Sequence, residues 1–155
     1  MIVERPVYTP NFGGRRGKSI RVIIIHCDAS PDENATRAWI QNSASKVSYL
    51  LEVERDGTVI RYVPDEMRAW AVGVSEWRGE TDLNSISLSA SFANRNDHHE
   101  LLTPIQIATM QDIVTAWRGK YPTIEAVDTH AAVARPLGRK VDPIGAPNFD
   151  LADYL

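Results

Sequence analysis

The chain has 155 residues, of which 43% are hydrophobic and 24% charged, and its formal net charge is −3. These values are typical of one soluble globular domain and give no reason to expect a nucleic-acid partner. The single cysteine, Cys27, excludes an internal disulfide and a cysteine-cluster metal site, and no apolar run is long enough to insert into a membrane.

Residues 1–19 are rich in glycine, proline, arginine and asparagine, and we expect an irregular arm that lies on the domain. They lack the apolar core of a signal peptide, so we expect a protein made in the cytoplasm. Residues 21–26 form a β-branched run that is too short for a helix and is typical of a central strand buried on both faces. This strand places His26 at its carboxyl end, where a lone histidine is more often structural than a ligand.

A short helix is expected over residues 35–42, where Asn34 is a suitable N-cap. Ala38 and Trp39 are expected on its inner side. A polar break over residues 43–46 ends this segment.

A β-hairpin is expected next, with residues 47–54 paired to residues 58–63 around an Asp-Gly turn. Tyr49 shares one face of the first strand with Leu51 and Val53, because side chains alternate along a strand. Taken alone, Tyr49 is most simply an aromatic residue packed in the sheet.

Residues 64–84 show no strong periodicity and predict a long surface loop, which in a compact domain usually has a functional or covering role. Trp70 and Trp77 either stack on a substrate or anchor the loop in the core. Residues 85–92 alternate between apolar side chains and serines, which predicts a strand with one packed face.

The strongest helix signal begins at Thr103, with a capping box and a proline at the first helical position, and ends at Gly119. The adjacent His98 and His99 precede it in a polar turn and are most simply solvated. A short strand over residues 124–129 follows. The element order therefore predicts a single α/β (α+β) domain over the whole chain, with a central mixed β-sheet flanked by helices.

The closing loop, residues 130–143, reads HAAVARPLGRKVDP, and its prolines and glycine discourage helix and strand. Two strands far apart in the sequence thus end in His26 and His130, and Asp142 follows in the loop. Two imidazoles and one carboxylate with an open coordination position make a catalytic Zn²⁺ site. The spacing alone is weakly specific, and a solvated polar connection is the alternative reading of this loop.

The sequence resembles the zinc-dependent N-acetylmuramoyl-L-alanine amidases, a family that includes phage endolysins, bacterial muropeptide amidases and peptidoglycan recognition proteins. The resemblance extends from Arg21 to the C-terminus and rests on VIIIHCDAS, VSYLLEVERDGTVIRYVPDEMRAWAVGVS, NSISLSASFAN and TH…GRKVDP. It implies the amidase-like fold, and it implies that His26, His130 and Asp142 bind zinc.

The activity implied by the resemblance is hydrolysis of the amide bond between N-acetylmuramate and L-alanine. Zinc would polarise the carbonyl and activate its water, and Lys140 would stabilise the developing oxyanion. Tyr49 matches the tyrosine that phage-type members place beside the metal, where its hydroxyl would orient the water or bind the intermediate. The implied partners are peptidoglycan or muropeptides, and we expect a monomer.

Several positions depart from the family pattern. Ser89 stands where many members carry a general-base glutamate, Leu50 and Ala71 stand where many carry histidines, and alanines follow His130. A general base contributes about 10²- to 10⁴-fold in rate, so its loss would weaken the enzyme. Phage-type members work without this glutamate, with the tyrosine and the lysine that this chain retains.

Three hypotheses remain at this point. The first is an active zinc amidase, either an endolysin released through a membrane pore or a muropeptide-recycling enzyme. The second is a peptidoglycan-binding module without catalysis, and the third is a structural part of a phage particle. The complete metal triad, together with Lys140 and Tyr49, favours the enzyme, because a pure binder needs no zinc site.

Overall fold

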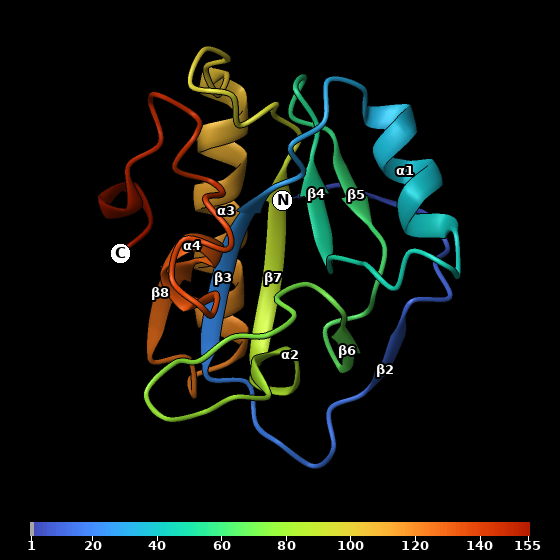
Figure 1. Ribbon diagram of the computed structural model, residues 1–155, viewed down its shortest axis with the longest axis vertical. Helices are drawn as coiled ribbons and strands as arrows, with labels where there is room; N and C mark the ends of the chain where they lie inside the picture. Colours follow the sequence, from blue (N-terminus) through green and yellow to red (C-terminus); the bar gives the residue numbers. More distant parts are fainter. Residues whose placement is uncertain (1) are drawn as a thin grey trace.

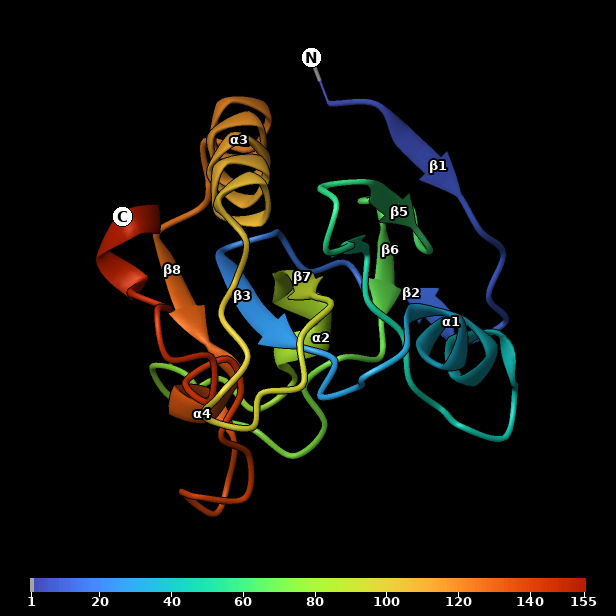
Figure 2. The same cartoon turned by 90° about the horizontal axis from the view of Figure 1, so that it is seen from above.

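The computed structural model describes residues 2–155, and its mixed β-sheet flanked by helices confirms the predicted fold class (Figures 1 and 2). Its main sheet has the strand order β1-β5-β4-β7-β3-β8. These strands are β1 (Glu4–Pro6), β5 (Val59–Arg61), β4 (Leu51–Val53), β7 (Ser87–Phe92), β3 (Val22–Cys27) and β8 (Ala126–Thr129). A second sheet pairs β2 (Phe12–Gly14) with β6 (Met67–Ala69). The helices are α1 (Glu33–Gln41), α2 (Leu83–Ile86), α3 (Pro104–Lys120), α4 (His130–Val133) and a C-terminal 3₁₀ turn, η1 (Leu151–Tyr154).

Strand β3 lies inside the sheet, next to the edge strand β8, and runs parallel to both neighbours, β7 and β8. All six of its residues are buried, as the β-branched run predicts. Ile23 and Ile25 pack into the larger core cluster, and Val22 and Ile24 pack into a smaller cluster on the opposite face. The long helix α3 lies towards the β8 end of the main sheet, and α1 lies towards the opposite end, where β5 is found (Figures 1 and 2).

The segment 64–84 is more structured than its sequence predicts, because it contains β6 and leads into α2. Trp77 from this segment is only 7% exposed and belongs to the smaller core cluster, so it is an anchor. The prediction for β7 is also corrected. All six residues of β7 are buried, so this strand is covered on both faces rather than on one.

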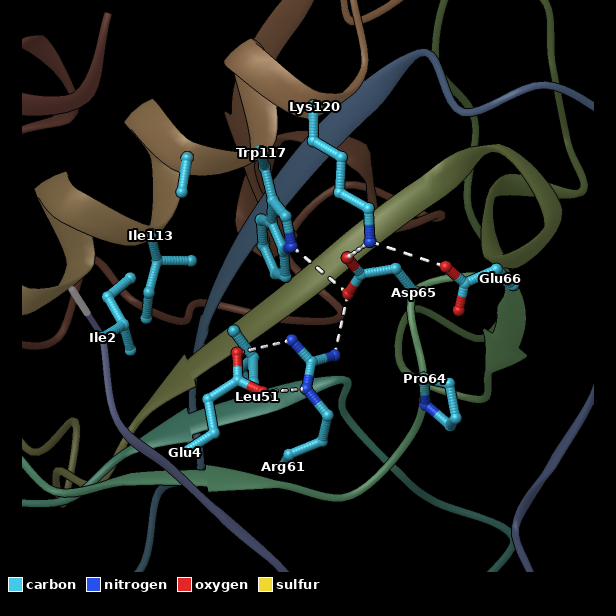
Figure 3. Close-up of a pocket in the computed structure, with 11 residues that line it drawn as sticks. Ile2, Glu4, Leu51, Arg61, Pro64, Asp65, Glu66, Ile113, Trp117 and Lys120 are labelled. Carbon is cyan, nitrogen blue, oxygen red and sulfur yellow. Dashed lines mark hydrogen bonds and ion pairs between the residues drawn. The ribbon is translucent and has the colours of Figure 1, made fainter.

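The amino-terminal arm, predicted as irregular, contributes β1 to the edge of the main sheet and β2 to the second sheet. The buried guanidinium of Arg15 donates to the carbonyls of Asp65 at 2.9 Å and Ser87 at 2.9 Å, which ties the arm to the core. Asp65 in turn accepts from Arg61 and Lys120 (Figure 3).

Helix α3 begins with the predicted capping box, in which Thr103 and Gln106 satisfy each other's backbone N–H groups. It runs one residue past the predicted end, to Lys120. The Gln106 amide also donates to the carbonyls of Val53 and Ala93, which fixes the helix to the ends of β4 and β7. No helix in the described residues is both long and apolar enough to cross a membrane.

The prediction for α1 was wrong in both its N-cap and its buried face. Asp32, not Asn34, is the N-cap, and the helix packs inwards through Thr36 and Ile40. Ala38 is exposed, and Trp39 leaves 56% of its surface in solvent. The earlier cap moves the start of the helix by two residues, but the inward face is selected by the apolar Ile40 rather than by the larger indole.

Candidate metal centre

Parallel strands bring the two histidines together. His26 is the fifth residue of β3, and β8 lies beside β3 in parallel register up to Thr129. The Thr129 hydroxyl then caps α4 by accepting from the N–H of Ala132, and His130 becomes the first helical residue. The centroids of the two imidazole rings lie 4.5 Å apart at the carboxyl edge of the sheet.

Asp142 reaches the same point from the closing loop. Its backbone carbonyl accepts from the N–H of Ala131 at 2.9 Å, which holds the loop against α4. Its carboxylate lies 3.1 Å from Nδ1 of His130 and 3.4 Å from Nδ1 of His26. One ligand atom from each of the three residues lies within 4.8 Å of the others, and all three residues are buried. The structure therefore brings together the three ligands that the sequence predicts.

The protonation states fit a metal site. Burial lowers the pKa of His26 to about 4, with a further contribution from the nearby His130 and partial compensation by Asp142. Burial would raise the pKa of Asp142, but the close approach of the carboxylate to the imidazoles of His130 and His26 outweighs burial and holds the pKa of this carboxyl well below its usual range. Neutral imidazole and ionised carboxylate are the forms that bind a divalent metal.

Two ring nitrogens supply the test of fit. Both nitrogens of His26 are buried and, among the described residues, lack a hydrogen-bond partner, because the 3.4 Å approach to Asp142 does not have hydrogen-bond geometry. His130 places Nε2 3.1 Å from the carbonyl of Val72, so this nitrogen donates and leaves Nδ1 free to bind. Buried polar atoms without partners are costly, and a cation between these rings would take one nitrogen of each imidazole. The His–His–Asp donor set with an open side fits zinc.

Tyr49 and Lys140, the two predicted catalytic residues, line the same pocket as His130 and Asp142, which we call the metal pocket and which has a volume of about 270 Å³. The ring of Tyr49 lies 5.2 Å from that of His26. Burial, reinforced by nearby carboxylates, raises the pKa of Tyr49 well above its usual value, so its hydroxyl remains a hydrogen-bond donor. Lys140 is exposed at the mouth, and its charge contributes to the lowered pKa of His26 after burial and His130.

The positions that depart from the family pattern are now placed. Ser89 pairs with Ile24 in the register of β7 and β3, two pairs before His26, and its side chain is buried. Its hydroxyl has no partner among the described residues. Ala71 lines the metal pocket, but Leu50 belongs to the apolar core. His98 and His99 are exposed and lie outside the candidate metal group.

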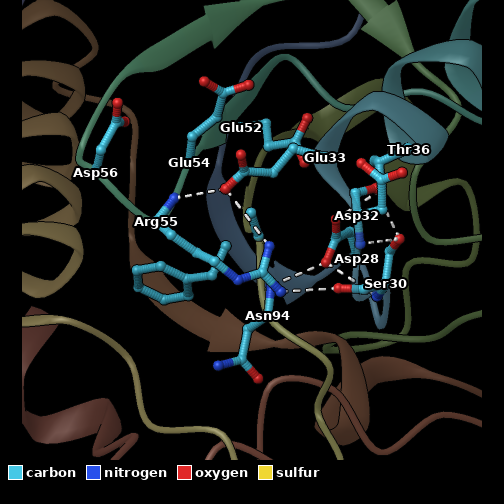
Figure 4. Close-up of polar contacts among 12 residues, drawn as sticks. Asp28, Ser30, Asp32, Glu33, Thr36, Glu52, Glu54, Arg55, Asp56 and Asn94 are labelled. Atoms are coloured by element: carbon cyan, nitrogen blue, oxygen red, sulfur yellow. Dashed lines mark hydrogen bonds and ion pairs between the residues drawn. The ribbon is translucent and has the colours of Figure 1, made fainter.

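Glu52 is the residue that the sequence reading missed. It pairs with Ser91 on β7, and Ser91 pairs with His26 on β3, so the three side chains share one row of the sheet. Glu52 is completely buried, accepts a hydrogen bond from the Tyr62 hydroxyl and leaves its other oxygen without a partner among the described residues. Burial, with the nearby Asp28 carboxyl, raises its pKa to about 8 (Figure 4). Glu52 therefore holds a proton at neutral pH.

This proton makes folding stability depend on pH. From the ordinary pKa of 4.5 to about 8, the folded state keeps the Glu52 proton that the unfolded state has lost, so the free energy of unfolding falls as pH rises. We expect Glu52→Gln to remove this slope and to be more stable than the wild type above about pH 8, by on the order of 2–4 kcal/mol. Urea unfolding across this pH range measures it, with the exposed Glu76→Gln as control. Parallel pH profiles for the wild type and Glu52→Gln would contradict the expectation.

Fold and site together define a class: α/β proteins with a buried His–His–carboxylate group that could hold a metal ion, at the carboxyl edge of a mixed sheet. The family described as N-acetylmuramoyl-L-alanine amidase matches residues 16–145, and the chain belongs to this family. The resemblance seen in the sequence motifs is thereby confirmed.

Individual relatives agree with this membership. The chain is 32% identical over 128 residues to the 1,6-anhydro-N-acetylmuramyl-L-alanine amidase AmpD of Enterobacter cloacae, covering 80% of this chain and 63% of that protein. It is 25% identical to a solved AmpD structure, with a TM-score of 0.77 over 97% of this chain and 91% of that one. It is 27% identical to AmiD from Escherichia coli, solved with anhydro-N-acetylmuramic acid-L-Ala-D-γ-Glu-L-Lys, with a TM-score of 0.71 over 83% of this chain and 55% of AmiD.

Proposed function

We propose that this protein is a zinc-dependent N-acetylmuramoyl-L-alanine amidase, which hydrolyses the amide bond between N-acetylmuramate and L-alanine. The observation that carries the proposal is the buried triad of His26, His130 and Asp142, with its unpartnered imidazole nitrogens, at a pocket that also holds Tyr49 and Lys140. A binding module would have no use for a buried set of metal ligands beside the Lys140 ammonium group.

Each residue has a role in the proposed reaction. His26, His130 and Asp142 would hold the zinc ion, which supplies Lewis acidity at the carbonyl and lowers the pKa of water. The Lys140 ammonium, at the mouth of the pocket, stabilises the negative charge that develops on the carbonyl oxygen. Tyr49 keeps its proton and therefore orients the attacking water or the intermediate by donating a hydrogen bond. Tyr49 therefore does not replace the general-base glutamate that many family members carry at the position of Ser89.

The role of Tyr49 is tested by removing one oxygen. Tyr49→Phe keeps the ring against His26 but loses the hydroxyl, so we expect zinc content to stay the same and kcat to fall about 10- to 100-fold. Steady-state kinetics and metal analysis on one preparation measure both quantities. The substitution Tyr8→Phe, at a tyrosine that is 73% exposed, is the matched control. An unchanged kcat in Tyr49→Phe would remove this residue from the mechanism.

We propose soluble muropeptides as the substrate class. The curated relatives are named as 1,6-anhydro-N-acetylmuramyl-L-alanine amidases, and AmiD was solved with an anhydro-muramyl peptide. These names support a recycling enzyme rather than an endolysin, whose release through a membrane pore stays a prediction from the sequence. The cytoplasmic site of action and the monomeric state also stay predictions.

Two substrates separate these possibilities. Anhydro-muramyl peptides in solution and insoluble peptidoglycan would be incubated with the zinc-loaded protein, and the new L-alanine amino groups would be counted. Release from the soluble substrate at a far higher rate supports recycling, and preferential release from the insoluble wall supports an endolysin. A protein that binds peptidoglycan and releases no amine from either substrate would overturn the amidase proposal.

A further inference from the structure

The backbone carbonyl of Val72 accepts hydrogen bonds from two side chains of the closing segment, residues 130–143. Nε2 of His130 lies 3.1 Å from this oxygen, and the Nη2 atom of Arg139 lies 3.1 Å from the same oxygen. A carbonyl oxygen has two lone pairs, so it accommodates both donors. One backbone atom therefore connects a candidate metal ligand with an arginine that lies outside the candidate metal group.

The Val72 carbonyl determines which nitrogen of His130 is free to bind a metal ion. Because Nε2 donates its proton to this carbonyl, Nδ1 keeps its lone pair on the side of Asp142, whose carboxylate is 3.1 Å away. Such outer partners fix the tautomer and the orientation of a ligating imidazole, and their loss typically costs about 10- to 100-fold in metal affinity. A displaced Val72 oxygen would therefore weaken the hold of His130 on a metal ion.

The backbone alone does not fix this oxygen. The side chain of Val72 packs in the smaller core cluster, and its N–H donates to Oδ1 of Asn84 at 3.0 Å. The next residue is Gly73, at φ +58°, which has no Cβ to restrict the peptide plane between the two residues. Apart from His130, Arg139 is the only side chain in the described part of the chain that donates to the Val72 carbonyl.

Arg139 is well placed to hold the turn at Gly73. Its Nη2 atom also donates to the carbonyl of Val74 at 2.6 Å, and its Nε atom donates to the carbonyl of Arg135 at 2.8 Å. The rigid, planar guanidinium therefore joins the closing segment to the carbonyls on both sides of Gly73. The side chain of Arg139 is exposed, so core packing does not depend on it.

We propose that Arg139 is a positioning residue for the metal centre. Its guanidinium holds the Val72 carbonyl where this oxygen receives the Nε2 proton of His130, and it thereby keeps Nδ1 available to the metal ion. For the identity of the metal, this role rests on the proposed function. An arginine with this role affects metal retention when no substrate is present, which a residue that only contacts substrate does not.

Zinc binding without substrate is the direct test. The dissociation constant of zinc and its rate of loss to an excess of chelator would be measured for the wild type, Arg139→Ala and Arg139→Lys. We expect Arg139→Ala to bind zinc about tenfold more weakly and to lose it faster. Arg139→Lys should recover part of this loss, because an ammonium group also donates to carbonyls but lacks the planar fork.

The matched control is Arg135→Ala. The guanidinium of Arg135 donates to the carbonyls of Ala132 and Ala134 in its own segment and does not contact the Val72 carbonyl. This variant removes the same charge from the same segment, and we expect it to bind zinc as the wild type does.

Exchange of the Nε2 proton of His130 with water, followed by NMR in the zinc-loaded protein, provides a second readout. His130 is only 5% exposed and this proton is held by the Val72 carbonyl, so we expect slow exchange in the wild type and in Arg135→Ala. Exchange should be faster in zinc-loaded Arg139→Ala. Equal exchange rates in the wild type and Arg139→Ala would contradict the positioning role.

The zinc measurements separate this role from the proposed function. A wild type that binds zinc, with an Arg139→Ala protein that binds it as tightly, would overturn the positioning role alone. So would a raised KM in Arg139→Ala with unchanged zinc dissociation, which would indicate a substrate contact. A wild type that binds zinc and releases no amine would overturn the proposed function alone, and a wild type that binds no zinc would overturn both.

Discussion

Asp142→Ala is expected to lose zinc and amide hydrolysis together. Asp142 contributes the only carboxylate of the candidate metal group, and its oxygens lie within 3.4 Å of Nδ1 of both His26 and His130. Loss of the ion removes several kcal/mol of transition-state stabilisation, so we expect kcat/KM to fall by at least about 10³-fold. His26→Ala is expected to give the same result. Zinc analysis and amine-release kinetics measure both effects.

The control for this prediction is Asp112→Ala, which removes an exposed carboxylate on α3, far in sequence from the ligands. It should keep zinc and rate. Added zinc should raise the melting temperature of the wild type and of the control, because the ion binds the folded state preferentially, and should leave that of Asp142→Ala unchanged. An Asp142→Ala protein that retains zinc and turnover would show that another residue completes the site.

Lys140→Met is expected to keep zinc but lose rate. The side chain is exposed at the mouth of the metal pocket and is not a ligand, so its removal takes away a positive charge and leaves the triad intact. The loss of one group that stabilises the oxyanion typically lowers kcat by about 10²- to 10³-fold. We expect that range, with little change in KM, in steady-state kinetics at matched zinc content.

Two companion variants sharpen this result. Lys140→Arg keeps the charge and should recover part of the rate, although a guanidinium does not reproduce the point charge of an ammonium. Lys18→Met removes a partly exposed lysine that pairs with Glu80 and should leave kcat unchanged. If Lys140→Met retained full kcat, the residue would be a surface lysine, which is the simplest alternative reading of the loop.

The sequence predicts the buried strand β3 and the capped helix α3 because each has a strong local signal: a β-branched run for β3, and a capping box with proline for α3. Both histidines follow from the strand ends. Asp142 follows in the closing loop, whose spacing is weakly specific, and the resemblance supported it as a ligand. The roles of Lys140 and Tyr49 came from the resemblance alone. In the structure, Tyr49, Lys140 and Asp142 line the metal pocket together with His130, and His26 lies beside His130 and Asp142.

Two features could not be predicted from the sequence, because they depend on which faces of the elements are buried by packing in the folded protein. Alternation places Glu52 on the strand face opposite Leu51 and Val53, and nothing local shows that this face is buried. The phase of α1 was missed for a related reason. A tryptophan normally marks the inner side of a helix, whereas here Ile40 packs inwards and Trp39 remains exposed beside a cavity.

The central claim is that the His26–His130–Asp142 triad holds zinc for amide hydrolysis. One measurement tests it most directly: metal analysis and amine release from an anhydro-muramyl peptide, made on the same purified protein before and after chelation. We expect about one zinc per chain, amine release in proportion to zinc content, and recovery of both on adding zinc back. A protein that carries zinc in these proportions and releases no amine would contradict the account.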